Sequence, residues 1–265
     1  MIREPVLALL LVSGPVAAQR LAERVGGAPD GTVRLTVAAR PGLWGNGRNV
    51  IALECSRGWC GKNTVMFDGN AEGEVEYDCE PGPVRVSLTV RAGRVVSLRT
   101  YVGGRWVAGP GSGVTDLGAV ASRDATDFLL ALARGTDGRV GEDAILPATL
   151  VDSVTVWPAL LDLARDERVP HRTRRQAVFW LGQAAGAAAT RGLTDLVDDA
   201  DVDRDVREQA VFALSQQPRD AGVPALLRIA RSHPDPAVRH KAIFWLGQSD
   251  DPRALALFEE LLTRP

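Results

Sequence analysis

The sequence has little of the chemistry from which catalytic and metal sites are built. Its 265 residues include only three histidines, three cysteines and two lysines. It contains no Gly-x-Ser-x-Gly, Walker or His-Glu-x-x-His motif. We therefore expect no catalytic residues, no cofactor and no bound metal, and we do not expect an enzyme.

Strong charge of one sign is also lacking, because the formal net charge is −2. Residues 1–118 carry 13 basic and 11 acidic side chains, and residues 119–265 carry 18 and 22. This balance gives no case for a nucleic-acid partner or an anionic membrane surface, since both require a basic face. The expected partner is an unidentified protein or peptide.

Long hydrophobic runs are absent, and the apolar segment at residues 6–12 is too short to span a bilayer. It follows one cation and precedes small residues that end at Ala18, which is typical of a secretory signal peptide. We predict a signal peptide at 1–18, export to the periplasm or beyond the cell, and no membrane insertion after cleavage. The alternative is an N-terminal core helix.

One phrase occurs three times in the second half of the chain. Residues 176–183 read QAVFWLGQ, residues 209–216 read QAVFALSQ and residues 241–248 read KAIFWLGQ. The period is about 33 residues, and one step back reaches a degenerate copy near Ala144. A fixed period of this length indicates stacked supersecondary units that bury a shared core.

Each repeat contains two helices. Val206, Ala210 and Leu214 lie four residues apart and fall on one helix face. Asp203 and Asp235 precede their helices at the position of an N-cap acceptor. A second apolar segment precedes each phrase, so two helices and two short turns fill one period.

This pattern resembles the HEAT repeat, in particular the short form described in phycobilisome lyases. The resemblance covers about 119–265 and implies an α-α superhelical solenoid of about four and a half helix pairs. It also implies that the second helix of each pair lines the concave surface. Some HEAT-like proteins are lyases or iron hydroxylases that bind metal through His-Glu pairs, but no histidine here is followed by glutamate.

The period changes to two in the first half of the chain. Residues 32–38, 84–90 and 95–102 alternate apolar and polar side chains, which predicts strands with one solvated face. We expect a flexible N-terminus at 19–30, a small antiparallel β-sandwich or barrel at 31–109 and a Gly-rich linker at 110–118. The β domain is expected to cover the end of the solenoid.

All three cysteines lie in the β domain. An exported chain meets an oxidising compartment, which favours a disulfide. A bridge to Cys79 closes a longer loop than one between Cys55 and Cys60 and is expected to stabilise more. We therefore predict that Cys79 pairs with Cys55 or Cys60, and the sequence does not choose between them.

The best candidate binding surface is a ladder on the expected concave face. At 100° per residue, each phenylalanine of the phrase lies away from the buried alanine, on the side of the final glutamine. Rings and amides in a row suit an extended polypeptide; the alternative places each ring in the seam between repeats. The ladder comprises Phe179, Gln183, Phe212, Gln216, Phe244 and Gln248.

Two other repeated positions are expected to be structural. Trp180 and Trp245 stand at a position that is normally small and inward, so we place them in the core. Arg174, Arg207 and Arg239 recur with the repeat and are expected to bind the acidic turns of neighbouring repeats.

Three functions are compatible with these features. The first is an exported binding or scaffold protein that recognises a protein through the concave face. The second is an enzyme whose site lies in the groove between the domains, where Glu142, Asp143, His171 and Arg172 are the available side chains. The third is a structural spacer in an envelope assembly. Exposed aromatic residues favour the first.

Overall fold

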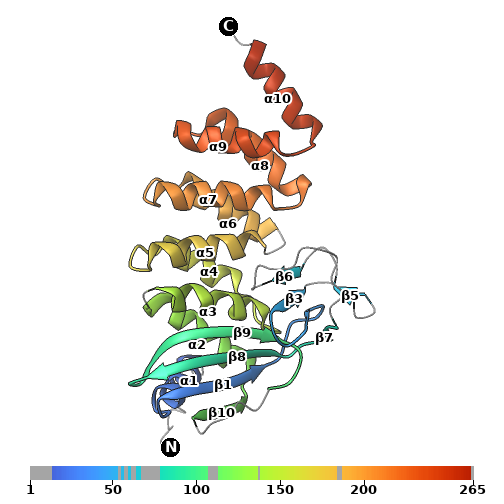
Figure 1. The fold of residues 1–265 in the computed structure, drawn as a ribbon. Coiled ribbons are helices and arrows are strands. Elements are labelled where there is room, and N and C mark those ends of the chain that lie inside the picture. The colour runs from blue at the N-terminus through green and yellow to red at the C-terminus, as the bar shows by residue number, and fades with distance from the viewer. Residues whose placement is uncertain are drawn as a thin grey trace, which may run out of the picture.

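A β region covers one end of a column of paired helices in the computed structural model (Figure 1). The structure describes residues 14–52, 55–56, 59–60, 64–66, 78–106, 113–136, 138–183 and 187–263. Most of the predicted signal peptide lies outside these ranges. For residues 14–18 the backbone alone is described.

Ten strands and one helix make up the β region within the described residues. They are α1 (Gly14–Gly26), β1 (Gly31–Val37), β2 (Trp44–Gly45), β3 (Val50–Ala52), β4 (Cys55–Ser56), β5 (Trp59–Cys60), β6 (Thr64–Met66), β7 (Glu80–Pro81), β8 (Val84–Arg91), β9 (Arg94–Val102) and β10 (Val114–Ala119).

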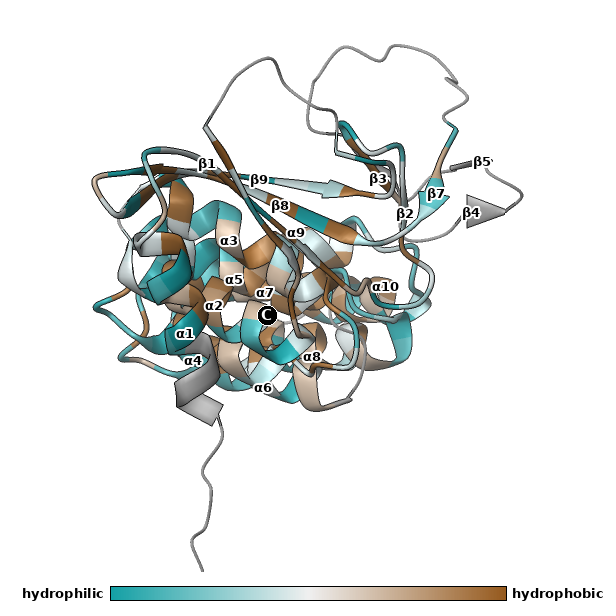
Figure 2. Ribbon diagram, turned by 90° about the horizontal axis from the view of Figure 1, so that it is seen from below, coloured by the Kyte–Doolittle hydropathy of each residue, from teal (hydrophilic) through white to brown (hydrophobic). Residues whose placement is uncertain are grey.

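The main sheet has the order β10-β1-β8-β9, with β10 parallel to β1 and the other pairs antiparallel. Side chains alternate across it as a strand requires. Val33, Leu35, Val86 and Leu88 are fully buried on one face, and Figure 2 shows that the helices lie on one side of this sheet. The opposite face carries polar side chains.

The main sheet packs on helices, and the described residues do not confirm the predicted β-sandwich or barrel. A second small sheet, β6-β3-β2-β7, lies at one end of the main sheet (Figure 1), and β4 pairs with β5. The apolar face of the main sheet shares one core with the helices, because β8 and β9 both contact α3 (Arg139–Leu150). A backbone bridge between Ala39 and Val151 joins the two regions.

Two boundaries predicted from the sequence are wrong. The segment 19–30, expected to be flexible, lies largely in α1, whose Leu21 and Val25 are buried against the core. The expected linker 110–118 overlaps β10, whose backbone pairs with β1. Short polar and Gly-rich stretches gave no local sign of these contacts, which only the packed neighbours supply.

The helices of the column form pairs, each packed against the next. The first helices are α2 (Ser122–Gly135), α4 (Trp157–Arg165), α6 (Ala187–Asp198) and α8 (Arg219–Ser232); the second are α3, α5 (His171–Gly182), α7 (Arg204–Ser215) and α9 (Pro236–Gly247); α10 (Pro252–Thr263) follows. Contacts join α3 to α5, α5 to α7 and α7 to α9, as expected of a HEAT-like stack.

The repeated small residues lie in the seams between these helices. Ala177, Ala210 and Ala242 have no exposed surface, and neither do Val206 and Leu214 on the same face of α7. A small side chain at the seam lets two helix backbones approach closely, so the four-residue spacing read from the sequence corresponds to a buried stripe.

The repeated arginines bind the next repeat, as predicted, in two of three cases. Arg174 forms an ion pair with Asp203, and Arg207 Nη2 lies 3.5 Å from Asp235 Oδ2. Arg239 instead donates to the carbonyl oxygens of its own turn, at 2.6 Å for His233. The predicted N-cap holds for Asp235, which accepts from the amide of Ala237 at 2.9 Å, whereas the Asp203 side chain does not cap α7.

The structure has Cys79 as a buried free thiol and does not show the predicted bridge to Cys55 or Cys60, whose side chains lie outside the described residues. The backbone register of β4 and β5 places Cys55 directly opposite Cys60. Cys79 itself lies just before β7. Burial raises the pKa of the Cys79 thiol, with a contribution from Asp78.

The seam yields a stability prediction. Ala210→Leu adds volume where no space exists, and we expect it to cost roughly 1–3 kcal/mol of unfolding free energy. Ala256→Leu, at an exposed position of α10, is the matched control and should leave the denaturant midpoint unchanged. Equal midpoints for Ala210→Leu and the parent protein would show that Ala210 does not lie in a tight seam.

Candidate functional site

The three phenylalanines of the ladder lie on successive second helices but differ in exposure. Phe244 on α9 is 54% exposed, while Phe179 and Phe212 are half-buried. The ring of Phe212 lies 4.9 Å from the ring of Trp245 in the next repeat. The ladder is therefore partly accessible, and its middle ring leans toward the neighbouring repeat.

The glutamines of the ladder stand at the ends of the same helices. Gln183, Gln216 and Gln248 are exposed C-cap residues of α5, α7 and α9. The side chain of Gln216 donates to Ser215 Oγ at 3.1 Å. The other two amides make no side-chain hydrogen bond within the described residues, so they can reach a ligand.

The two tryptophans lie beside the ladder. Trp180 and Trp245 are half-buried against the core, and each ring meets the preceding phenylalanine edge to face at centroid distances of 5.2 and 5.0 Å. Their indole N–H groups are buried without a hydrogen-bond partner. The predicted core position therefore holds in part, because both tryptophans pack against the core but keep some exposed surface.

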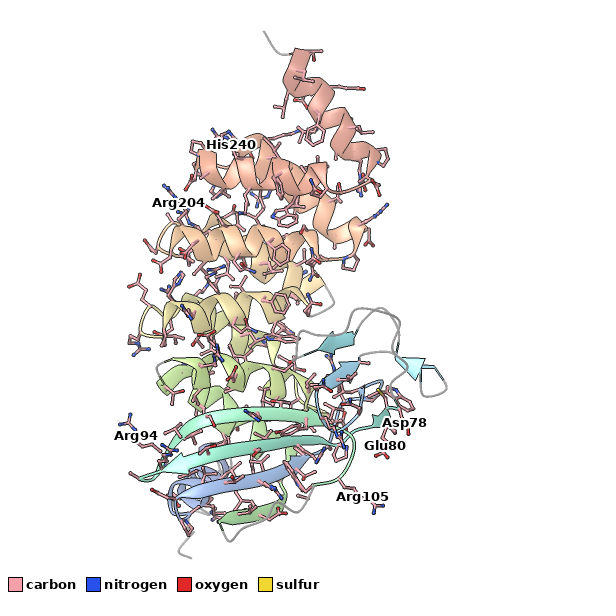
Figure 3. All side chains as sticks on the ribbon, in the orientation of Figure 1. Asp78, Glu80, Arg94, Arg105, Arg204 and His240 are labelled. Atoms are coloured by element: carbon pink, nitrogen blue, oxygen red, sulfur yellow. The ribbon has the colours of Figure 1, made fainter. Side chains whose placement is uncertain are left out.

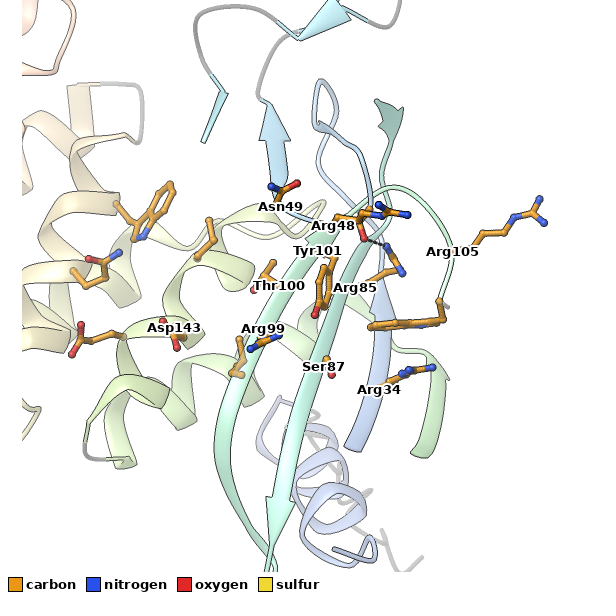
Figure 4. A pocket seen from close by; sticks show the side chains of 17 residues that line it. Arg34, Arg48, Asn49, Arg85, Ser87, Arg99, Thr100, Tyr101, Arg105 and Asp143 are labelled. Atoms are coloured by element: carbon orange, nitrogen blue, oxygen red, sulfur yellow. Dashed lines mark hydrogen bonds between the residues drawn. The ribbon is translucent and has the colours of Figure 1, made fainter. Parts of the chain in front are cut away.

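A cleft of about 900 Å³ opens between the main sheet and two helices of the column, α3 and α5 (Figure 4). One wall comes from β1, β8, β9 and nearby loops, and the other comes from α3 and α5. It is lined by Arg34, Gly47, Arg48, Asn49, Arg85, Ser87, Leu98, Arg99, Thr100, Tyr101, Arg105, Trp106, Glu142, Asp143, Leu146, Gln176 and Trp180.

The sheet side of the cleft carries Arg34, Arg48, Arg85, Arg99 and Arg105, which we call the arginine wall. It was not predicted from the sequence. Arg34 and Arg99 occupy one cross-strand row with Ser87 between them, and Arg85 stands opposite Tyr101 in the adjacent row. The outward positions of the alternating strands were visible in the sequence. Which strands would be neighbours was not, so the convergence of these arginines could not be read from it.

Arg85 is the centre of this wall. Only 4% of it is exposed, and its Nε and Nη2 donate to the carbonyl oxygens of Gly103 and Gly47, both at 2.8 Å. Its guanidinium also lies 4.7 Å from the Trp106 ring centroid. Burial lowers the pKa of Arg85, which Tyr101 and Glu80 partly offset. The group remains a cation at neutral pH.

The aromatic residues hold the arginines in place. Arg34 lies 4.9 Å from the centre of the Trp106 ring, and Tyr101 meets that ring edge to face at 6.0 Å. Cation–π contacts of this length stabilise a guanidinium without neutralising it. The wall therefore presents charge that is positioned by rings and carbonyl oxygens.

The helical wall of the cleft carries carboxyl groups. Glu142 and Asp143 lie on α3, and both are half-buried. The pKa of Asp143 is raised chiefly by burial, with Glu142 adding to the rise and Arg139 opposing it. Of the four side chains considered for a groove enzyme, these two line the cleft, whereas His171 and Arg172 do not.

His171 belongs to a different cluster, on the solenoid surface. Its Nε2 contacts Asp205, and ligand atoms of His171, Asp203 and Asp205 lie within 4.8 Å of one another. Such a set has the donor types of a metal site. Arg174 already supplies a cation to Asp203, so the cluster is accounted for as part of the contact between α5 and α7.

The described helices include none that is both long and apolar enough to cross a membrane.

Asp143 yields a prediction about pH. Because its folded pKa is raised, ionisation of this carboxyl destabilises the fold, and the loss sets in as pH rises through the unfolded value of about 3.9. Asp143→Asn should therefore raise the melting temperature at about pH 7 and change it little at about pH 3, where both side chains are neutral. Thermal melts at both pH values test this; a stabilisation of equal size at both would refute it.

Comparison with known proteins agrees with the helical architecture. Residues 190–265, which span most of α6 through α10, match the family model of HEAT repeats. No curated protein matches the chain. The C-terminal part of the column is thus similar to HEAT repeats, a class that commonly mediates protein–protein interaction or scaffolding.

Proposed function

We propose that this is an exported scaffold protein that binds an extended polypeptide along the face formed by α5, α7 and α9. The observation that carries the proposal is the exposure of Phe244, at 54%, beside the partly buried ring pair of Phe212 and Trp245. A large ring left in solvent within an aromatic row is the usual mark of a contact surface.

The face supplies both kinds of contact that a polypeptide requires. Phe179, Phe212 and Phe244 offer rings that can be covered by apolar side chains of a partner. The exposed amides of Gln183 and Gln248 can donate to and accept from a backbone. The relatively rigid stack of helices presents these groups with little ordering cost on its own side.

The alternatives are less well supported. A structural spacer is expected to have a featureless polar face, which the aromatic row does not match. An enzyme of the groove type required Glu142, Asp143, His171 and Arg172 to converge, and the last two lie outside the cleft. A lyase or hydroxylase function of the HEAT-like type is not supported by the sequence, because no histidine is followed by glutamate.

The binding prediction uses the exposed ring. Phe244→Ser should change stability by no more than about 0.5 kcal/mol, as expected for a surface substitution. It should also reduce capture of crosslinked partner peptides from envelope extract several-fold, measured by quantitative mass spectrometry.

Leu255→Ser is the matched control, because Leu255 on α10 is 65% exposed and lies outside the ladder. It removes a comparable apolar group elsewhere and should leave capture unchanged. Equal capture by the parent protein and both variants would remove the ladder as the binding surface.

Export gives a second prediction. Cleavage after Ala18 falls within α1 yet keeps Leu21 and Val25, which are the buried ones among the side chains described in that helix. N-terminal sequencing of protein from the native host should therefore begin at Gln19. Recovery of intact Met1 from a cytoplasmic fraction would contradict export.

A further inference from the structure

Several arginines of the solenoid form ion pairs with acidic side chains of other helices or turns. On the sheet wall, Arg48, Arg85, Arg99 and Arg105 form none among the described residues. The solenoid pairs include Arg134–Asp166, Arg165–Asp199, Arg174–Asp203, Arg207–Asp235, Arg228–Asp198 and Arg231–Glu260.

Part of the positive charge of the wall belongs to a buried arginine whose side chain is held in place by its neighbours. Arg85 is buried and fixed by two carbonyl oxygens and two rings. Glu80 acts on it only at longer range, and the Glu80 carboxylate accepts from the amide of Gly104 at 3.1 Å. Around this fixed centre, Arg48, Arg99 and Arg105 are exposed and available to an anion.

The spacing of the wall fits several carboxylates better than one small anion. Arg34 and Arg99 share a row across three strands, so their backbones lie about 10 Å apart at the usual strand spacing. In an extended peptide, the side chains on one face recur about every 7 Å. Successive carboxylates on one face of an acidic chain are therefore spaced to meet more than one guanidinium group of the wall.

The cleft is continuous with the aromatic face. Gln176 and Trp180 of α5 line it, and the Trp180 ring contacts Phe179, the first ring of the ladder. A partner polypeptide that is bound at the arginine wall and continues across α5 therefore reaches the ladder. The carboxyl groups of Glu142 and Asp143 on the helical wall repel an anion there, which favours binding of an acidic segment on the sheet side of the cleft.

We propose that the arginine wall binds an acidic stretch of the partner polypeptide, while the segment that follows lies along the ladder. This inference rests on the proposed function and adds the charge and direction of the partner. Guanidinium groups bind carboxylates with paired hydrogen bonds. The wall therefore selects partners that carry several aspartates or glutamates next to an apolar segment.

The test measures binding of a fluorescent hexaglutamate peptide to the mature protein by anisotropy. Arg99→Gln combined with Arg105→Gln should weaken binding about tenfold, since each exposed charge pair contributes a few-fold. Both side chains are exposed, so the fold should be kept, which circular dichroism checks. Arg48→Gln is a second variant whose loss of affinity should point the same way.

Arg94→Gln is the matched control. Arg94 is exposed on the same strand as Arg99 but lies at the end away from Arg105 (Figure 3). We expect its affinity to stay within about twofold of the parent protein, because its charge lies outside the cleft. A loss equal to that of the cleft variants would show that only general charge matters and would overturn the proposal.

Competitors separate the possible anions. Hexaglutamine should not bind, and inorganic phosphate or an oligouronate should compete only at much higher concentration than hexaglutamate. Equal competition by phosphate would assign the wall to small anions, and equal competition by the oligouronate would assign it to acidic sugars. Either result would overturn the peptide assignment.

Failure of this inference can be told apart from failure of the proposed function. If Phe244→Ser reduces partner capture several-fold and the double arginine variant captures normally, the ladder function stands and the acidic-segment inference falls. If hexaglutamate binds as expected but the ladder variant captures normally, the wall binds acidic peptides and the ladder is not the contact surface.

Discussion

Close packing of successive repeats through small side chains is the constraint on which the rest of the structure depends. No single helix pair can bury its apolar face alone, and Ala177, Ala210 and Ala242 allow the next pair to approach until no surface is left exposed at these positions. The first pair lacks a preceding repeat, and the apolar face of the main sheet covers it. Sheet and column therefore share one core.

The same stacking separates the arginines that form ion pairs between repeats from those on the outer face of the main sheet. Between repeats, two turns bring an acidic residue to the arginine of the preceding repeat, Asp203 to Arg174 and Asp235 to Arg207. The outer face of the main sheet has no repeat packed on it. Its arginines are held by Trp106, Tyr101 and carbonyl oxygens, so the charge faces the cleft.

Aromatic residues connect the two candidate surfaces. Trp180 belongs both to the cleft and to the row that continues through Phe179, Phe212 and Phe244. The second copy of the phrase has Ala213 where the other two copies have a tryptophan. Phe212 of the second copy contacts the Trp245 ring of the third copy. The row therefore crosses the repeats, and a ligand on it contacts neighbouring helices at once.

The sequence by itself determined the helical column, its period and the buried alanine stripe, because the position of a side chain on a helix face follows from spacing along the chain. It also determined the alternation of the strands in the main sheet. The ladder was located in the sequence, but whether its rings are exposed depends on neighbours such as Trp245.

Only the tertiary structure decided which distant segments meet. It placed β10 beside β1, packed α1 on the core, left Cys79 as a free thiol and gathered residues between Arg34 and Trp180 into one cleft. Local periodicity says which side of an element is buried. It carries no information on which element lies against it, and the arginine wall exists only because three strands and two helices are packed together.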